Sequence, residues 1–260
     1  MRVLQVSDVH FGVEDGFAIE ALTRLVDDEK PDAILICGDL TQRGSKKEFL
    51  QAREWLDTLR CKKLVVPGNH DTPLLNLIER ASAPFRRFEE YFGDLSEDLV
   101  LGDWRFIGLN TARGWQARQN WADGVVNIVD LKAKLDHPER LALICHHPLQ
   151  APPGSALQVD TKRANLADKL LKSSGVELIL SGHIHMPSAE YRRDETGGYI
   201  AITSGTLSRR IRNAPASCNL LEFDRDQLAI SSVSFTEPGP VYKEVGVFGP
   251  HLGTAARAER

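Results

Sequence analysis

The sequence has few cysteines and no long apolar run. Its four cysteines, Cys37, Cys61, Cys145 and Cys218, are too scattered for a disulfide scaffold, and we expect reduced, mostly buried thiols. No apolar run approaches the roughly 18 residues that a membrane span requires. The chain opens with MRVLQVSD, already a strand pattern, which leaves no room for a signal peptide. These absences predict a soluble, cytoplasmic protein.

The chain also lacks an excess of basic charge, an internal repeat and a linker. A formal net charge of -4 excludes a global basic field, so binding to long nucleic acid is not expected. With 260 residues, 42% of them hydrophobic, the chain can bury a sizeable core. We expect one domain over 1–236, followed by a Pro/Gly-rich tail over 237–260 that forms no regular element.

Short apolar runs alternate with helical stretches through most of the chain, which is typical of α/β proteins. Ser45 and Glu48 form a capping box that predicts a helix, Asn127 is placed to cap a second, and a third is expected over about 162–173. From about residue 188 the period becomes two, with a Gly-Gly turn signal, which predicts an added antiparallel sheet.

Five of the apolar runs end in side chains that could bind metal. Six of the eight histidines lie at these ends. The carboxyl ends of strands in open α/β sheets converge on one edge, so the five ends predict one shared site. Each end taken singly could be a turn or polar surface, and the inference depends on their joint occurrence. The residues are Asp8 and His10, Asp39, Asn69 and His70, His146 and His147, and His183 and His185.

The donor types narrow the metal. Carboxylates, imidazoles and an amide without a thiolate suit Mn²⁺, Fe²⁺/Fe³⁺ or Zn²⁺ at a catalytic site. Seven candidate ligands are too many for one catalytic ion, whereas they suit two divalent ions about 3.5 to 4 Å apart that share a carboxylate.

The motifs at these ends resemble those of the calcineurin-like metallophosphoesterase superfamily. They are DVH at 8–10, GD at 38–39, GNHD at 68–71, HHP at 146–148 and GHIH at 182–185, in this order. The resemblance covers residues 1 to about 187. The start MRVLQVSDVHFG, the block GDLTQRG and the loop TSGTLS look most like bacterial cyclic-nucleotide phosphodiesterases of the cyclic-AMP type. The resemblance implies a four-layer αββα sandwich built on two mixed sheets.

It also implies the role of each ligand. One ion would be held by Asp8, His10, Asp39 and His185, and the other by Asp39, Asn69, His146 and His183, with Asp39 as the bridge. Hydroxide held between the ions would attack phosphorus. His70 stands where the family places the residue that supplies a proton or positive charge to the leaving oxygen. Asp71 is expected to hold the His70 ring in orientation and to favour its protonated form.

Three residues near the motifs could either contact the substrate or have a purely structural role. His147 could touch the substrate or have a structural role, since the family pattern makes the first histidine of the pair the ligand. Asn110 and Arg113, in the segment GLNTARG, could reach the same edge or form a simple turn.

Two further segments could contact substrate. The run SRRIR places Arg209, Arg210 and Arg212 after a predicted strand, where they would suit an anionic substrate or form a solvated turn. Trp115 and Trp121 could stack on a base, or could pack an ordinary loop.

Three functions are compatible with these features. The first is a dinuclear-metal phosphodiesterase that acts on small diesters such as cyclic nucleotides. The second is a hydrolase of lipid-linked phosphate or pyrophosphate, or a nuclease, on the same core; the acidic net charge argues against the nuclease. The third is a catalytically inactive metal-binding scaffold, although such proteins typically lose ligands and all seven are present here. A homodimer is left open.

Overall fold

Two mixed sheets form the centre of the molecule. The computed structural model describes residues 1–95, 97–115, 122–212, 214–225 and 227–249. In spatial order, the first sheet contains β12 (Pro240–Phe248), β11 (Leu228–Phe235), β10 (Ser217–Phe223), β1 (Arg2–Val6), β2 (Ala33–Cys37) and β3 (Lys62–Val66). The second contains β4 (Asp98–Leu101), β5 (Trp104–Gly108), β6 (Arg140–Ile144), β7 (Val176–Ser181), β9 (Gly197–Thr203) and β8 (Ser188–Asp194).

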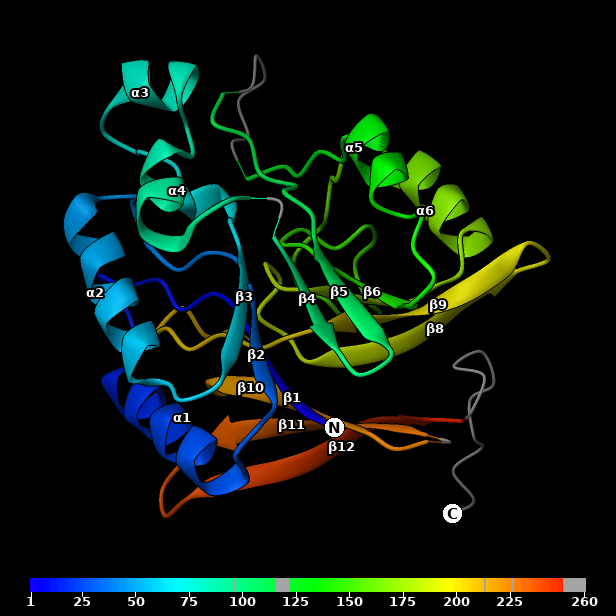
Figure 1. Cartoon of the computed structure of the whole chain (residues 1–260). Helices are drawn as coiled ribbons and strands as arrows, with labels where there is room; N and C mark the ends of the chain where they lie inside the picture. The colour runs from blue at the N-terminus through cyan, green and yellow to red at the C-terminus, as the bar shows by residue number, and fades with distance from the viewer. Residues whose placement is uncertain (96, 116–121, 213, 226, 250–260) are drawn as a thin grey trace.

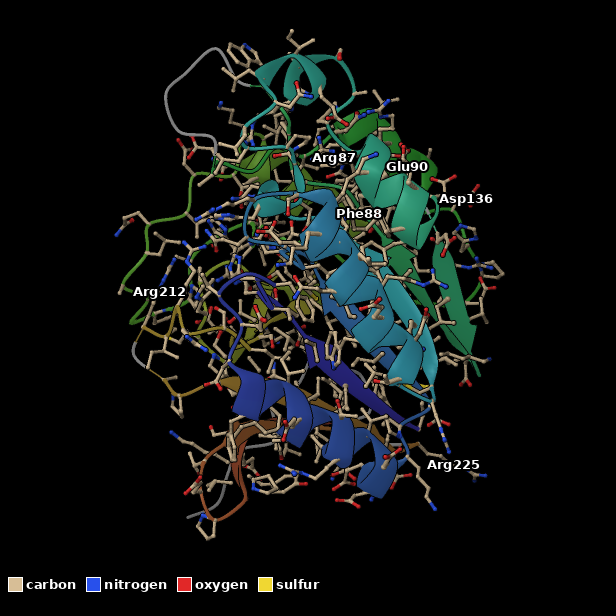
Figure 2. All side chains as sticks on the ribbon, turned by 90° about the vertical axis from the view of Figure 1, so that its left-hand side faces the viewer. Arg87, Phe88, Glu90, Asp136, Arg212 and Arg225 are labelled. Atoms are coloured by element: carbon tan, nitrogen blue, oxygen red, sulfur yellow. The ribbon has the colours of Figure 1, made fainter. Side chains whose placement is uncertain are left out.

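Helices cover the outer faces of both sheets, which confirms the four-layer αββα sandwich (Figure 1). On the first sheet these are α1 (Gly16–Glu29), α2 (Lys46–Thr58) and α4 (Arg86–Phe92). On the second they are α5 (Ile128–Ala133) and α6 (Ala164–Ser173). In Figure 2, α1 and α2 lie in front of the first sheet, and Arg87 and Phe88 of α4 are labelled near α2.

Side chains alternate between the two faces of each strand. This alternation builds the three apolar cores that lie between the four layers of helices and sheets. In β1, Leu4 and Val6 face α1 and α2, whereas Val3 faces the second sheet. Strand side chains point alternately to opposite faces, so one apolar run supplies both cores. This double burial explains why the runs are continuously apolar.

The helices begin where the sequence predicts. The Ser45 side chain accepts from the Glu48 N–H at 3.3 Å and the Glu48 carboxylate accepts from the Ser45 N–H at 3.1 Å, so the capping box of α2 is present. Asn127 caps α5, and α6 lies within the range expected for the third helix.

The second half of the chain differs from the expectation in three ways. The strands after residue 188 do not form a separate sheet, because β8 and β9 extend the second sheet and β10 to β12 extend the first. The turn between β8 and β9 falls on residues 195–196, and the glycine pair begins β9. The expectation that 237–260 forms no regular element is wrong for β12, which pairs with β11 along its length. Its Pro240 is tolerated at the first position of an edge strand.

The topology brings the five polar strand ends to one place. Strands β1, β2 and β3 run parallel in the first sheet, as do β6 and β7 in the second, and their carboxyl ends meet across the sandwich. The site therefore lies between two sheets rather than at the edge of one. No described helix is both long and apolar enough to cross a membrane.

Candidate metal centre

Asp8, His10 and His185 form the first group of donors, from the loops after β1 and β7. The His185 Nε2 lies 3.0 Å from Asp8 Oδ1, and the His10 Nε2 lies 3.6 Å from the same oxygen. Asp8 and His10 are fully buried and His185 is 2% exposed. One carboxylate oxygen thus faces two imidazole nitrogens inside the protein.

Asp39 joins this group to a second one. Its Oδ2 lies 3.8 Å from His10 Nε2 and 3.3 Å from His146 Nε2. The His146 Nε2 in turn lies 3.2 Å from Asn69 Oδ1 and 3.3 Å from His183 Nδ1. The structure therefore brings all seven predicted ligands together, with Asp39 between the two groups.

Backbone carbonyls orient three of the four ligand imidazoles. In each case Nδ1 lies on a carbonyl, to which it donates, so Nε2 presents its lone pair to the centre. The pairs are His146 with the Cys37 carbonyl at 2.8 Å, His185 with Arg210 at 2.7 Å and His10 with Thr41 at 3.4 Å. Such a hydrogen bond suits a metal ligand, because it fixes the proton on Nδ1 and leaves Nε2 free to bind the ion.

The backbone of the ligand loops is strained. Among the described residues, seven other than glycine have positive φ, and five of these are predicted ligands. Such a backbone conformation is uncommon for residues with a side chain and is tolerated where the surroundings enforce it. The five ligands are Asp8, His10, Asp39, His183 and His185, with φ between 50° and 70°.

Two motif glycines are required by close approach. A Cβ at Gly182 would collide with Ser7 Oγ and with the Asp8 carboxylate, and a Cβ at Gly68 would collide with the Asp39 carboxylate. The glycines of GHIH and GNHD therefore let two loops close onto the two carboxylates.

The electrostatics of the centre favour bound cations. Burial alone would raise the pKa of Asp8, but His185 and His10 hold that pKa well below its usual range. Burial alone would also raise the pKa of Asp39. The neighbouring His146 is the largest influence that holds this pKa below its usual range. Burial and the neighbouring His146 lower the pKa of His183 to about 3. Two buried, ionised carboxylates need positive charge beside them, which divalent ions supply.

The donor set fits a pair of metal ions. Four overlapping groups of three carboxylate and imidazole donors have ligand atoms within 4.8 Å of one another. Asp8, His10 and His185 would hold one ion and Asn69, His146 and His183 the other, with Asp39 shared.

His70 faces the same centre, but a different group orients it. The His70 Nδ1 lies 2.7 Å from the Gln42 carbonyl, so the expectation that Asp71 holds this ring is wrong. Asp71 is fully buried, and its carboxylate ties the GNHD loop to the loop after β2; burial and the charge of Asp39 raise its pKa to about 6. It accepts from the N–H groups of Gly68, Leu40 and Thr41 and from the Thr41 hydroxyl.

A cleft of about 250 Å³ opens onto the centre. His147 lines it, with Nδ1 3.0 Å from the Thr111 hydroxyl and its ring edge-on to His146 at 4.7 Å. Asn110 and Arg113 are not among its described lining residues. Asn110 Oδ1 accepts from the Ala112 N–H at 2.8 Å, so Asn110 forms a turn, the second of the two roles considered for it.

The three arginines of SRRIR have different positions. Arg210 and Arg212 line the cleft, whereas Arg209 is exposed and is not among the lining residues. The Arg210 Nη1 lies 3.1 Å from His70 Nε2 and 3.3 Å from His10 Nε2. Arg210 thus reaches the centre with its guanidinium and orients His185 with its carbonyl.

Several residues at the centre and in its cleft were not singled out in the sequence. Gln42, in GDLTQRG, orients His70 and also lies 3.4 Å from Arg210 through Oε1. Residues 157–161 and 122–124 form another wall. No motif marks these segments, because only the fold brings them to the cleft. Trp115 is exposed and Trp121 lies outside the described residues.

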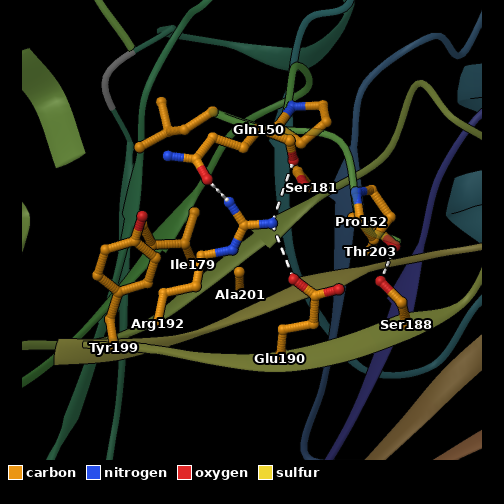
Figure 3. Close-up of a pocket in the computed structure, with 12 residues that line it drawn as sticks. Gln150, Pro152, Ile179, Ser181, Ser188, Glu190, Arg192, Tyr199, Ala201 and Thr203 are labelled. Carbon is orange, nitrogen blue, oxygen red and sulfur yellow. Dashed lines mark hydrogen bonds and ion pairs between the residues drawn. The ribbon is translucent and has the colours of Figure 1, made fainter. Parts of the chain in front are cut away.

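A second, smaller hollow lies between β8, β9 and the loop after His147 (Figure 3). Arg192 contacts Gln150 Oε1 at 2.5 Å and Glu190 Oε2 at 2.9 Å inside it. The remaining space is about 10 Å³, enough for one water molecule. The Arg192–Glu190 ion pair and the hydrogen bond to Gln150 occupy this hollow, so the wider cleft at the metal centre is the better substrate site.

The sandwich and its donor set define the class of protein: a dinuclear-metal phosphoesterase. The sequence model of the calcineurin-like phosphoesterase family matches residues 1–187, and the chain belongs to that family. It is 25% identical over 203 residues to a probable cyclic nucleotide phosphodiesterase of Vesicomyosocius okutanii, covering 74% of this chain and 81% of that protein.

A second relative and a solved structure extend the comparison. A probable glycerophosphodiester phosphodiesterase of Arcobacter nitrofigilis is 28% identical over 171 residues, covering 61% of this chain and 58% of that protein. A dimetal phosphatase from Danio rerio shares the fold, with a TM-score of 0.67, 13% identity and coverage of 95% and 99%.

Proposed function

We propose that this chain hydrolyses small phosphodiesters such as cyclic nucleotides. One P–O ester bond breaks, water is added, and the products are a phosphomonoester and an alcohol group. The observation that supports this is the convergence of seven metal donors, His70 and Arg210 on one cleft. When bound, two divalent ions, for which Mn, Fe and Zn are the candidates, neutralise phosphoryl oxygens and lower the pKa of water.

His70 is proposed to serve the leaving oxygen. Its Nδ1 donates to the Gln42 carbonyl, so its Nε2 faces the cleft and can carry the proton that the leaving group takes. Asp71 supports this role indirectly, because it holds the GNHD loop on the loop that contains Gln42. His147 would line the substrate side of the same cleft.

The names of the relatives motivate two diester classes, cyclic nucleotides and glycerophosphodiesters. Hydrolysis of lipid-linked phosphates and of nucleic acid are the alternatives on the same core. A cytoplasmic location and a single domain over 1–236 remain predictions from the sequence, although β12 adds Pro240–Phe248 to the first sheet, and a homodimer stays open.

The test is a metal-dependent activity panel. The protein is treated with a chelator, and Mn²⁺, Zn²⁺ or Fe²⁺ is then restored singly with bis-p-nitrophenyl phosphate as the first substrate. We expect no turnover after chelation and recovery with at least one metal. The active form is then assayed with 3′,5′- and 2′,3′-cyclic nucleotides, glycerophosphodiesters and single-stranded DNA. The absence of turnover with every metal would remove the enzymatic proposal, and a preference for DNA would favour the nuclease.

Arg210 and Arg212 are expected to bind the substrate anion. Replacing either by methionine should raise KM for the natural diester about 10-fold or more, because each guanidinium lines the cleft. The change for bis-p-nitrophenyl phosphate should be smaller. Arg209→Met is the matched control, since Arg209 comes from the same run but is not among the lining residues. Equal changes in KM for the three variants would mean that Arg210 and Arg212 do not bind the substrate and that SRRIR is ordinary protein surface.

A further inference from the structure

An exposed apolar surface follows the His70 loop. Leu74, Leu75, Leu77 and Ile78 are 40%, 88%, 50% and 83% exposed, and we call these four residues the α3 patch. Single exposed apolar residues are ordinary, but four within five consecutive positions form a patch that calls for a partner. Leu77 and Ile78 begin α3 (Leu77–Ser82), which projects from the body of the molecule, away from both sheets (Figure 1).

An exposed tryptophan comes close to α3. Gly114 accepts a hydrogen bond from Arg80 Nε of α3 at 2.6 Å, and the next residue, Trp115, is 52% exposed. Tryptophan is favoured at membrane interfaces because its ring is apolar and its N–H is polar.

Basic residues border the α3 patch. Arg43 and Lys47, both exposed, line the same groove as Leu74 and Leu75, and the Leu74 N–H donates to the Arg43 carbonyl at 3.0 Å. Arg80 of α3 is 3% exposed, and Arg86 and Arg87 are paired with Glu79. The positive charge at the border of the patch therefore comes from Arg43 and Lys47.

We propose that the α3 patch docks on an anionic lipid bilayer. Leu75 and Ile78, the most exposed of the four, would enter the boundary between headgroups and acyl chains, while Arg43 and Lys47 contact lipid phosphates. An anionic bilayer binds surfaces that combine exposed apolar side chains with bordering basic residues.

The charge at the border disfavours a second copy of the chain as the partner. A two-fold interface places the same patch on both sides. The described lining of the groove contains Arg43, Lys47 and Arg87 and one carboxylate, Glu48, so two copies would bring together two surfaces of net positive charge. An anionic bilayer instead neutralises this charge.

The surface is separate from the metal centre but linked to it through one loop. Gln42 orients His70, and the adjacent Arg43 binds Leu74 through its carbonyl. Docking would bring the loop of His70 towards the bilayer. The binding test is independent of the proposed hydrolysis, because Leu75 and Ile78 do not line the cleft.

The experiment measures cosedimentation of the full chain with vesicles. One set contains phosphatidylcholine alone and the other an equal mixture of phosphatidylcholine and phosphatidylglycerol. We expect binding to the anionic set only. Leu75→Ser with Ile78→Ser should weaken it about 10-fold or more, because two exposed apolar side chains are lost. Arg43→Glu with Lys47→Glu should also reduce it. The matched control is Val129→Ser, since Val129 is 79% exposed on α5.

Three results would overturn the proposal. These are no binding of the wild-type chain to anionic vesicles, equal binding to both vesicle sets, and unchanged binding by the double serine variant. A dimer in sedimentation that the serine variant abolishes, without vesicle binding, would assign the patch to a second copy. Hydrolysis of bis-p-nitrophenyl phosphate should be unchanged in the serine variant, which shows that it is folded.

Discussion

Replacing Asp39 by alanine is expected to lower kcat/KM by about 10³- to 10⁵-fold and to reduce bound metal from two ions per chain to one or none. Asp39 is the carboxylate between the two donor groups, at 3.8 Å from His10 and 3.3 Å from His146. Its other oxygen accepts from the His70 N–H at 2.8 Å. The substitution would therefore remove the ligand that the two proposed ions share, together with a contact of the His70 loop. Metal analysis of the purified variant and its activity with bis-p-nitrophenyl phosphate are the measurements.

Asp168→Asn is the control for this prediction. Asp168 is also a buried aspartate, but it lies on α6 and pairs with Tyr199 and Lys172. This variant should keep both ions, even where its stability falls. An Asp39→Ala variant that retained two ions and near-normal activity would exclude the bridging role.

Replacing His70 by alanine is expected to lower kcat by about 10²- to 10⁴-fold while both ions stay bound. His70 Nδ1 is engaged by the Gln42 carbonyl, and its Nε2 faces the cleft beside Arg210. A residue that protonates the leaving oxygen matters most when that oxygen is a poor leaving group. The loss should therefore be much larger for an alkyl diester or cyclic nucleotide than for a p-nitrophenyl ester, whose phenolate needs little assistance.

Metal content separates this role from ligation. His70 also lies within reach of His10 and Asp39 as a possible third donor. Loss of an ion in the His70→Ala variant would make His70 a ligand, and an equal loss of rate for both kinds of leaving group would contradict proton donation. His137→Ala is the control, because His137 lies outside the five motifs.

The sequence predicted which side chains converge, because these donors are encoded locally. Each donor follows directly on an apolar run, and two motif glycines, Gly68 and Gly182, lie where a loop must pass close to a carboxylate. The helix starts at Ser45 and Asn127 were predicted for the same reason, since a cap depends on residues two or three positions away.

The errors concern contacts between distant segments. The orientation of His70 was assigned to its neighbour Asp71, whereas the Gln42 carbonyl, 28 positions away, provides it. Strand β12 was taken for an irregular tail, because proline and glycine are frequent there, but pairing with β11 outweighs local preference. The three arginines of SRRIR were indistinguishable in sequence and are distinguished by which of them reach the cleft.

The sequence by itself determined the donor set of this protein: two carboxylates, an amide and imidazoles at the ends of five apolar strands, with the glycines that let them approach. Only the tertiary structure decided how the atoms of these groups are arranged. It placed Asp39 between two groups of ligands, turned the Nε2 atoms of three ligand histidines inward by binding their Nδ1 atoms to carbonyls, and brought Arg210 to His70 across 140 positions of the chain. A motif records which residues follow a strand, whereas ring orientation and charge pairing depend on groups that only folding brings within hydrogen-bonding distance.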